Sequence, residues 1–211
     1  MTEIIPLFPL KLVCFPGESL NLHIFEERYK NLINDVQSNN QNFGIPPVHD
    51  EALYPIGSEI ELMTIAHTYH DGKLDIKTRC LRKFHILRIV DEGTPTSYMQ
   101  AEVEYLEDNS KGDQHLQQEC LDRVAKLYDI MRIDQEVPQW SPTFKLASII
   151  HKIGLNYEQE LEMFELATEN DRLRYAINHL ENVLPMVKEM EEMRKKVEMN
   201  GHFKHFDPPQ L

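Results

Sequence analysis

The stretch IPLFPLKLVCFPGESLNLHIFEERY, residues 5–29, is the part of the chain that decides the fold. Large apolar side chains fill it, but three prolines interrupt them and Pro16-Gly17 is a turn signal. Proline suits the second position of a type II turn, and glycine accepts the positive φ that the third position requires. We therefore expect two short strands, residues 4–8 and 20–24, on either side of this turn.

The same stretch does not have the features of a secretion signal. Glu3 stands where a signal peptide carries positive charge, and the prolines break the apolar run that such a peptide needs. Nowhere do about 18 apolar residues run together, as a transmembrane helix requires. Cys14, Cys80 and Cys120 lie far apart without C-x-x-C spacing, which is typical of buried thiols in a reducing compartment. We expect a cytoplasmic protein.

Charge and length limit the classes of function. The 211 residues carry a formal net charge of -13. This charge disfavours nonspecific nucleic-acid binding, which depends on Lys and Arg neutralising phosphates, and it disfavours an anionic membrane surface. The length is sufficient for one large domain or for two coupled subdomains.

The first half of the sequence reads as β structure with one helix. The helix is expected over residues 26–37, with carboxylates in its first turn and an apolar face formed by Tyr29, Leu32, Ile33 and Val36. Asp71-Gly72 lies between two β-like runs and predicts a two-residue hairpin turn. Residues 99–105 alternate between apolar and polar, as in a half-buried strand. We expect β-rich structure up to about residue 110.

The second half reads as helical. One apolar face is formed by Leu116, Cys120, Val124, Leu127 and Met131. Ser141-Pro142 predicts the start of a second helix that Gly154 ends, and Asn156 with Gln159 predicts the capping box of a third. A long fourth helix begins near Thr168, and Pro185 should kink it. We expect three segments: a β subdomain at 1–112, a helical bundle at 113–199 and a flexible tail at 200–211.

Several motifs, in order, give the chain a family resemblance. Pro6 to Leu10, Phe15 to Gly17 and Ile24 to Tyr29 are similar to the opening of the Lon substrate-binding domain family, the N-terminal region of ATP-dependent Lon proteases. Further matches are Asn42-Phe43-Gly44-Ile45, Pro55-Ile56-Gly57-Ser58 and Asp71-Gly72-Lys73. The resemblance covers about residues 3–190. It implies an α+β fold: a PUA-like β pseudo-barrel, then a C-terminal α-helical bundle with a long last helix.

One segment departs from the family pattern. Where the family usually has G-x-x-R-F, this chain has Cys80-Leu81-Arg82-Lys83-Phe84, so the glycine is lost and the basic residue is shifted. The resemblance does not define the local backbone geometry there.

The sequence offers little that points to catalysis. Lon proteases add an ATPase with a G-x-x-x-x-G-K-[ST] loop and a Ser-Lys catalytic domain, and this chain has no such loop. We interpret it as a stand-alone member that is not an enzyme and needs no cofactor. His67 with His70 and His202 with His205 lack the further ligands of a zinc site, so no metal is expected. Cys14 reads as a buried inert thiol rather than a nucleophile.

The candidate binding residues are Phe25, Glu26, Glu27, Arg28 and Tyr29, a charged helix start beside two aromatic rings. The resemblance implies a non-catalytic module that binds peptides or unfolded proteins. One alternative is an adaptor that holds a single folded partner through its C-terminal helix. A weaker alternative is an RNA-binding PUA-like protein, which the acidity and the lack of a basic stripe with aromatics oppose. The sequence does not indicate an oligomeric state.

Overall fold

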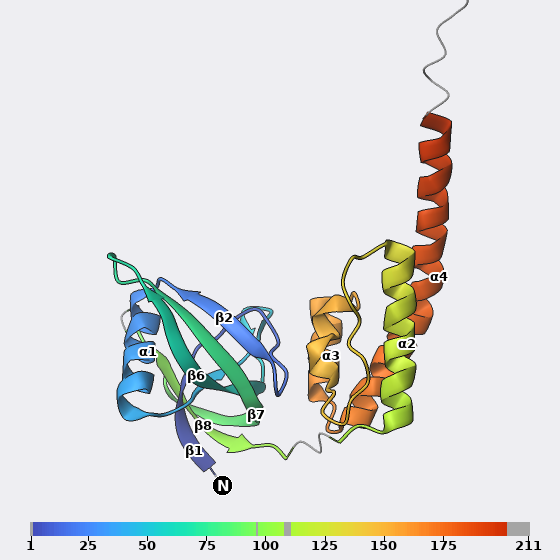
Figure 1. Ribbon diagram of the computed structural model, residues 1–211. Helices are drawn as coiled ribbons and strands as arrows, with labels where there is room; N and C mark the ends of the chain where they lie inside the picture. The colour runs from blue at the N-terminus through green and yellow to red at the C-terminus, as the bar shows by residue number, and fades with distance from the viewer. Residues whose placement is uncertain (1, 96, 108–110, 202–211) are drawn as a thin grey trace, which may run out of the picture. The chain divides into compact units, whose positions relative to one another are not determined.

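The computed structural model describes residues 2–95, 97–107 and 111–201. Contacts within the chain divide it into two units, each described by itself. The barrel unit comprises the residues up to Lys111 together with Asn156–Glu169, and the helical unit comprises Gly112–Leu155 together with the residues from Asn170 onward. Figure 1 shows β strands in the first unit and long helices in the second.

Six of the strands in the described part of the chain form one sheet, in the order β2-β7-β6-β3-β1-β8. Their bounds are β1 Thr2–Leu7, β2 Ser19–Ile24, β3 Phe43–Ile45, β6 Ile56–Thr68, β7 Leu74–Asp91 and β8 Met99–Tyr105. The neighbours are antiparallel except β1 and β3, which are parallel. A separate short ribbon consists of β4 Val48–His49 and β5 Ala52–Leu53.

The sheet closes on itself because β7 is long enough to have different partners along its length. Its 18 residues pair with β2 at the start, where Leu74 lies opposite Ile24, and with β8 at the end, where Asp91 lies opposite Gln100. β6 pairs along most of β7, with three register shifts that bend the pair. The expected pseudo-barrel is therefore confirmed.

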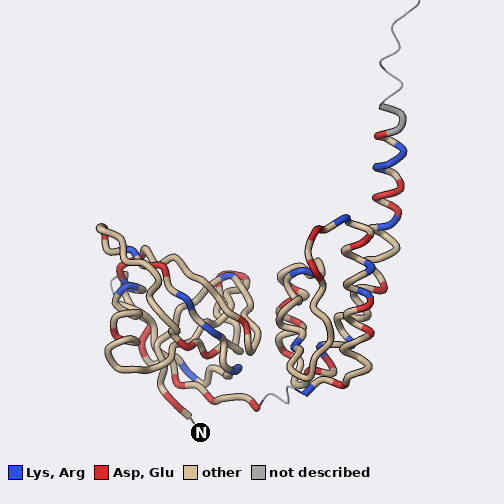
Figure 2. Tube along the Cα trace, in the orientation of Figure 1, with Lys and Arg blue, Asp and Glu red and all other residues tan. Residues whose placement is uncertain are grey.

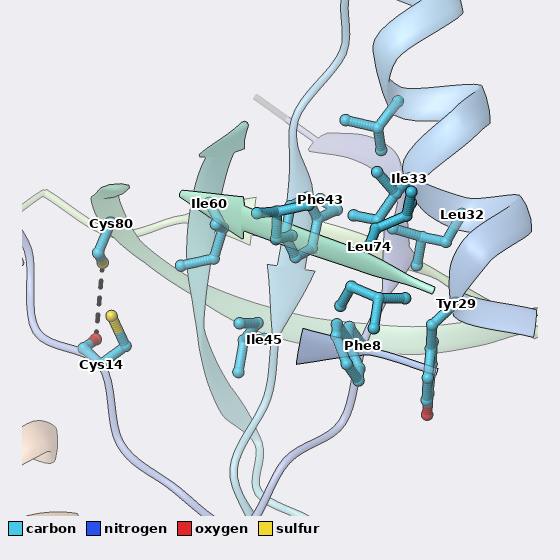
Figure 3. Close-up of a cluster of buried hydrophobic side chains, with 13 residues drawn as sticks. Phe8, Cys14, Tyr29, Leu32, Ile33, Phe43, Ile45, Ile60, Leu74 and Cys80 are labelled. Atoms are coloured by element: carbon cyan, nitrogen blue, oxygen red, sulfur yellow. Dashed lines mark hydrogen bonds between the residues drawn. The ribbon is translucent and has the colours of Figure 1, made fainter. Parts of the chain in front are cut away.

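Helix α1, Glu27–Asn39, packs its apolar face against the barrel interior (Figure 3). Leu32 and Ile33 are fully buried, and they join a cluster with Phe8, Phe43 and Ile60. Burying one such side chain stabilises the fold by about 1.5 to 3 kcal/mol. The helix predicted over residues 26–37 is confirmed, with Glu26 as its N-cap residue.

The two predicted turns are both present, one of them in a different form. Gly17 has φ 96° and the Glu18 amide donates to the Phe15 carbonyl, as a type II turn requires. The hairpin is closed by the Tyr69 amide donating to the Lys73 carbonyl at 2.9 Å, so its loop has three residues instead of two. Gly72, at φ 79°, occupies the left-handed position of that loop.

The helical unit is built on α2, Gln114–Met131, and α4, Glu169–Gly201. The Asp113 carboxylate caps α2 by accepting from the amides of His115 and Leu116. The helix predicted from Ser141-Pro142 to Gly154 was wrong, because only two 3-10 turns form there, Leu146–Ser148 and Ile150–Lys152. The Gln117 side-chain amide, in α2, donates to the Phe144 carbonyl at 3.2 Å, so a contact with a residue distant in sequence helps to set the path of this segment.

The third helix, α3 Tyr157–Glu165, has the predicted Asn156–Gln159 capping box. Its contacts group it with the barrel unit, whereas the sequence boundaries placed it in the bundle at 113–199. The Phe164 ring meets the Phe15 ring edge-on at 5.5 Å, and the Tyr157 hydroxyl donates to the Val48 carbonyl at 2.8 Å. These contacts between residues distant in sequence have no local signal.

The last helix continues through Pro185 and includes Asn200 and Gly201. The rest of the expected tail, residues 202–211, lies outside the described residues. In the part of the chain that the structure describes, no helix combines the length and apolar composition needed to cross a membrane.

Candidate binding site at the β2–α1 edge

Phe25 lies between the end of β2 and the beginning of α1, and its side chain points outward. The preceding Ile24 is 1% exposed, and because side chains alternate along an extended backbone, Phe25 faces the other way. Its exposed fraction is 59%. An exposed phenylalanine next to a core residue offers an apolar contact that the fold does not use.

Glu26 and Arg28 form a charged pair beside this ring. The Glu26 carbonyl accepts from the amides of Tyr29 and Lys30, which starts the helix. Its carboxylate caps no backbone amide and instead lies 2.8 Å from Arg28 Nη2 and 2.9 Å from Nε. Surface pairs of this kind stabilise a protein by about 1 kcal/mol at most, so they remain available to a ligand.

Tyr29 differs from the other four predicted site residues because it is part of the core. It is 6% exposed, and its ring stacks on Phe8 with 3.9 Å between centroids. Burial raises the pKa of its hydroxyl. The Arg28 guanidinium covers the ring at 4.6 Å. Tyr29 therefore lies in the core beneath the edge, as expected for its place on the apolar face of the helix, and its proposed part in binding would be to position the exposed residues above it.

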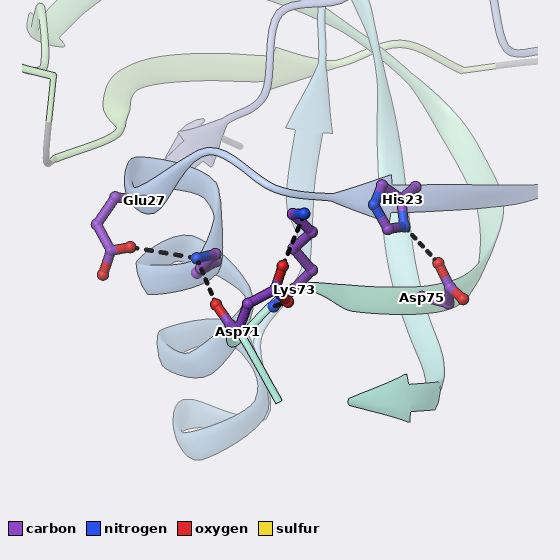
Figure 4. A network of polar contacts seen from close by, with 6 residues as sticks. His23, Glu27, Asp71, Lys73 and Asp75 are labelled. Carbon is purple, nitrogen blue, oxygen red and sulfur yellow. Dashed lines mark hydrogen bonds and ion pairs between the residues drawn. The ribbon is translucent and has the colours of Figure 1, made fainter. Parts of the chain in front are cut away.

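The first turn of α1 is tied to the tip of the β6–β7 hairpin (Figure 4). Lys30 Nζ lies 3.4 Å from the Glu27 carboxylate and donates to the Asp71 carbonyl at 3.5 Å. The Asp71 carboxylate pairs with Lys73 at 2.7 Å, and this hydrogen bond lowers the Asp71 pKa. The contacts join two segments about forty residues apart in sequence at one edge of the barrel.

Next to Phe25, three strands place a row of polar side chains on one face of the sheet. His23 in β2 and His67 in β6 each lie directly opposite Asp75 in β7. Asp75 accepts a hydrogen bond from His23 Nδ1 at 2.7 Å and another from the Tyr69 hydroxyl at 2.7 Å. Both hydrogen bonds lower the Asp75 pKa, and the bond from His23 has the larger effect. Figure 4 shows His23 and Asp75 pointing toward each other from neighbouring strands.

The rings around this row form a continuous exposed surface. The His23 ring stacks near Phe25 at 6.2 Å and meets Tyr69 edge-on at 5.7 Å, while His67 meets Tyr69 at 4.4 Å. We call this surface the Phe25 edge and define it as Phe25, His23, His67, Tyr69 and Asp75, with Glu26, Glu27 and Arg28 as its charged rim. The sequence pointed to Phe25 and the rim. It did not point to the rest, because their placement depends on strand register.

A cavity of about 370 Å³ opens beside the Phe25 edge. It shares His23 and Asp75 with the edge, and its lining is Asn21, Leu22, His23, Ala66, Asp75, Ile76 and Lys77. This lining combines apolar residues, among them Leu22 and Ile76, with the polar side chains of His23 and Asp75. Its size suits one or two side chains of an extended ligand better than a large cofactor.

Within the described residues, no group of three or more His, Cys, Asp and Glu side chains is placed to hold a metal ion. His202 and His205 lie outside those residues. Cys14 is 3% exposed, and its pKa is raised by the contact with Cys80 and by burial. A thiol with a raised pKa stays protonated at neutral pH, so Cys14 is a poor nucleophile.

The fold is thus a closed β pseudo-barrel with helices, and the barrel carries an exposed aromatic edge. The chain belongs to the family of the ATP-dependent protease La (LON) substrate-binding domain, whose model matches residues 4–182. This family recognises protein substrates in general. The structural resemblance covers most of the chain.

Two solved structures illustrate this resemblance. One is the crystal structure of a Lon N-terminal domain protein from Xanthomonas campestris, with TM-score 0.62 and 24% identity over 82% of this chain and 95% of that one. The other is the N-terminal domain of a Mycobacterium avium complex Lon protease, with TM-score 0.61 and 12% identity over 85% of this chain and 98% of that one. At these identities the similarity shows the fold alone. Curated proteins gave no match.

Proposed function

We propose that the chain binds extended or unfolded segments of other proteins at the Phe25 edge and does not cut them. The observation that carries this proposal is the 59% exposure of Phe25 within a cluster of rings that has a charged rim. An unfolded segment offers scattered apolar side chains and free backbone groups. A partly apolar surface with a polar rim suits both.

The affinity we expect is modest. Ordering a flexible client offsets much of the contact energy, so binding in the micromolar range, about 8 kcal/mol, is the natural scale. Broad selectivity follows, because Phe25 and Tyr69 are exposed rings that can contact many kinds of apolar side chain. The free, buried cysteines support a reducing compartment for this binding, which we take to be the cytoplasm.

A non-catalytic role is part of the proposal. The titratable groups of the Phe25 edge are hydrogen-bonded to one another. Asp75 accepts from His23 and Tyr69, and its lowered pKa keeps it ionised. A lowered carboxyl pKa makes a weak general base at neutral pH. This arrangement favours recognition over acid–base chemistry.

A second candidate function is an adaptor that holds one folded partner through the last helix. The observation in its favour is the exposure of apolar side chains on α4, with Met186 at 63% and Met190 at 66%. An RNA-binding role receives less support, because the net charge of -13 repels phosphates.

Fluorescence anisotropy with a panel of unrelated labelled peptides tests the main proposal. We expect Phe25→Ala to weaken binding across the panel by about tenfold, since an exposed ring at the centre of a contact contributes strongly. Leu87→Ala is the matched control, because Leu87 is an exposed apolar residue, 46% accessible, elsewhere on the barrel. Equal losses for both variants, or none for Phe25→Ala, would place the site elsewhere.

Charge reversal at the rim tests selectivity separately. In the Glu27→Lys/Arg28→Glu double variant, position 27 faces Lys30 and position 28 faces Glu26, so two surface pairs become repulsive. Surface changes of this kind cost little stability. We expect the ranking of acidic and basic peptides to change while the melting temperature stays near that of the parent. An unchanged ranking would show that the rim does not touch clients.

A further inference from the structure

The last turns of α4 carry an apolar stripe, and most of its members are exposed within the described residues of the helical unit. Its members are Val183, Met186, Met190, Met193 and Val197. Val183 is partly buried and the other four are exposed. Met193 is 52% and Val197 70% accessible. Exposed apolar side chains scattered singly need no explanation, but four exposed side chains aligned with a fifth, partly buried one on a single helix face do. We call this set the α4 stripe.

The stripe lies on the side of α4 that faces away from α2. The groove between α2 and α4 is lined on α4 by Glu181, Leu184, Pro185, Lys188, Glu191, Glu192 and Lys195. At 100° per residue, the middle of that groove-lining set and the middle of the stripe are about half a turn apart. α2 therefore cannot cover the stripe, and Figure 1 shows α4 running on past the end of α2.

The stripe has the spacing of a coiled-coil seam. Successive members are separated by three, four, three and four residues, which is the a and d repeat of a heptad. Val183 and Val197 fall at a positions, where β-branched residues favour two parallel strands. A core-facing helix in a globular domain shows a broader apolar face than this narrow line.

The charges beside the stripe complement a second copy of the same helix. Glu189 precedes an a position and Arg194 follows a d position, so in a parallel pair each Glu189 meets the Arg194 of the other copy. Within one chain, Arg194 forms exposed ion pairs with Glu191 at 3.2 Å and with Glu198 at 3.1 Å. A Glu189 from the second helix can join these ion pairs. Figure 2 shows the mixed charges on this end of α4.

We propose that two copies of this chain associate through the α4 stripe as a parallel, in-register, two-stranded coiled coil. In a parallel alignment, each of the five apolar residues packs against the same residue of the second copy. An antiparallel alignment that pairs Met190 with Met193 instead sets Val183 against Asn200 and loses one apolar layer. Two heptads make a short seam, so we expect a dissociation constant on the order of 10 µM. This inference does not depend on the proposed client site.

Sedimentation equilibrium of the full chain over a range of concentrations tests the association. The parent should shift from monomer to dimer, and Met190→Glu/Met193→Glu should remain monomeric. Met131→Glu is the matched control, because Met131 is exposed at the end of α2 and is not part of the stripe. A monomeric parent at about 100 µM, tenfold above the expected dissociation constant, would overturn the proposal. So would a double variant that, with an unchanged circular dichroism spectrum, still dimerises.

A charge swap tests the parallel arrangement. Glu189→Arg alone and Arg194→Glu alone each place like charges across a parallel seam and should weaken the dimer by about tenfold, since two pairs are affected. The double swap restores opposite charges and should restore the parent affinity. In an antiparallel pair Glu189 instead approaches Lys196, so the double swap would not restore binding. That result would overturn the parallel arrangement.

Discussion

Lys83, in β7, donates a hydrogen bond at 2.9 Å to the main-chain oxygen of Phe164, at the end of α3. The same Nζ donates to the Leu166 carbonyl at 2.9 Å, and Lys83 is only 2% exposed. The last carbonyl groups of a helix lack partners within it, and Lys83 supplies the donors. The basic residue that departs from the family pattern thus holds α3 against the barrel.

Lys83→Met should destabilise the protein by about 2 to 4 kcal/mol, because two buried carbonyl groups lose their donor. Urea unfolding monitored by circular dichroism measures this. Arg79→Met on the same strand is the control: its pair with Glu61 is exposed, so the loss should stay below about 1 kcal/mol. Similar losses for the two variants would contradict the capping role.

Gly57→Ala should destabilise the barrel, because a Cβ at Gly57 would overlap the ring of Phe84. Phe84 is fully buried and cannot move aside without disturbing its neighbours. Overpacking of this kind costs about 1 to 3 kcal/mol, measurable by thermal unfolding. Adding Phe84→Leu should recover part of the loss by making room. A Gly57→Ala protein as stable as the parent would show that the ring adapts freely.

Tyr98 should make stability fall at alkaline pH. Burial and the hydrogen bond at 2.7 Å to Asp35 raise its pKa to about 12. In the unfolded chain tyrosine ionises near its ordinary value of 10.0. The folded state therefore keeps a proton that the unfolded state loses, so this contribution is complete below about pH 10 and is lost as pH rises toward 12.

The measurement for Tyr98 is a comparison of unfolding free energies for the parent and Tyr98→Phe at several pH values. The difference between the two unfolding free energies should shrink as pH rises from about 10 to about 12. Ultraviolet titration of the folded parent should show one more late tyrosine ionisation than the variant, because other tyrosines, such as Tyr54, also have a raised pKa. A stability difference that does not change with pH would show that Tyr98 ionises as freely in the folded protein as in the unfolded one.

Asp75 should titrate below its ordinary value of 3.8, because hydrogen bonds from His23 and then Tyr69 stabilise its carboxylate. Its lowered pKa means that these contacts persist as pH falls through the usual aspartate range and are lost only below it. Carboxyl carbon chemical shifts, followed by NMR against pH, give the value directly. His23→Gln should raise this pKa, and Tyr69→Phe should raise it less. An Asp75 that titrates at its ordinary value in the parent would contradict the row of contacts.

Local chemistry explains why much of the fold could be predicted. Pro16-Gly17 forms the expected turn, α1 buries the expected face, and β8 covers the expected residues 99–105. Each depends on side-chain period or on turn residues within a few positions. The prediction for segment 141–154 failed for the complementary reason: contacts with residues distant in sequence, such as Gln117 with the Phe144 carbonyl, accompany two short 3-10 turns instead of one helix.

The candidate binding site also combines features set by neighbouring residues in the chain with features set by contacts distant in sequence. The sequence by itself determined that an aromatic residue and a charged helix start occur together at residues 25–28, since these are neighbours in the chain. Only the tertiary structure decided that Tyr29 is buried on Phe8 and that His23 meets Asp75, 52 residues away. Lys83 and Phe164 are 81 residues apart. Such contacts depend on strand register and helix packing, which are set by the free energy of the whole core and not by local propensity.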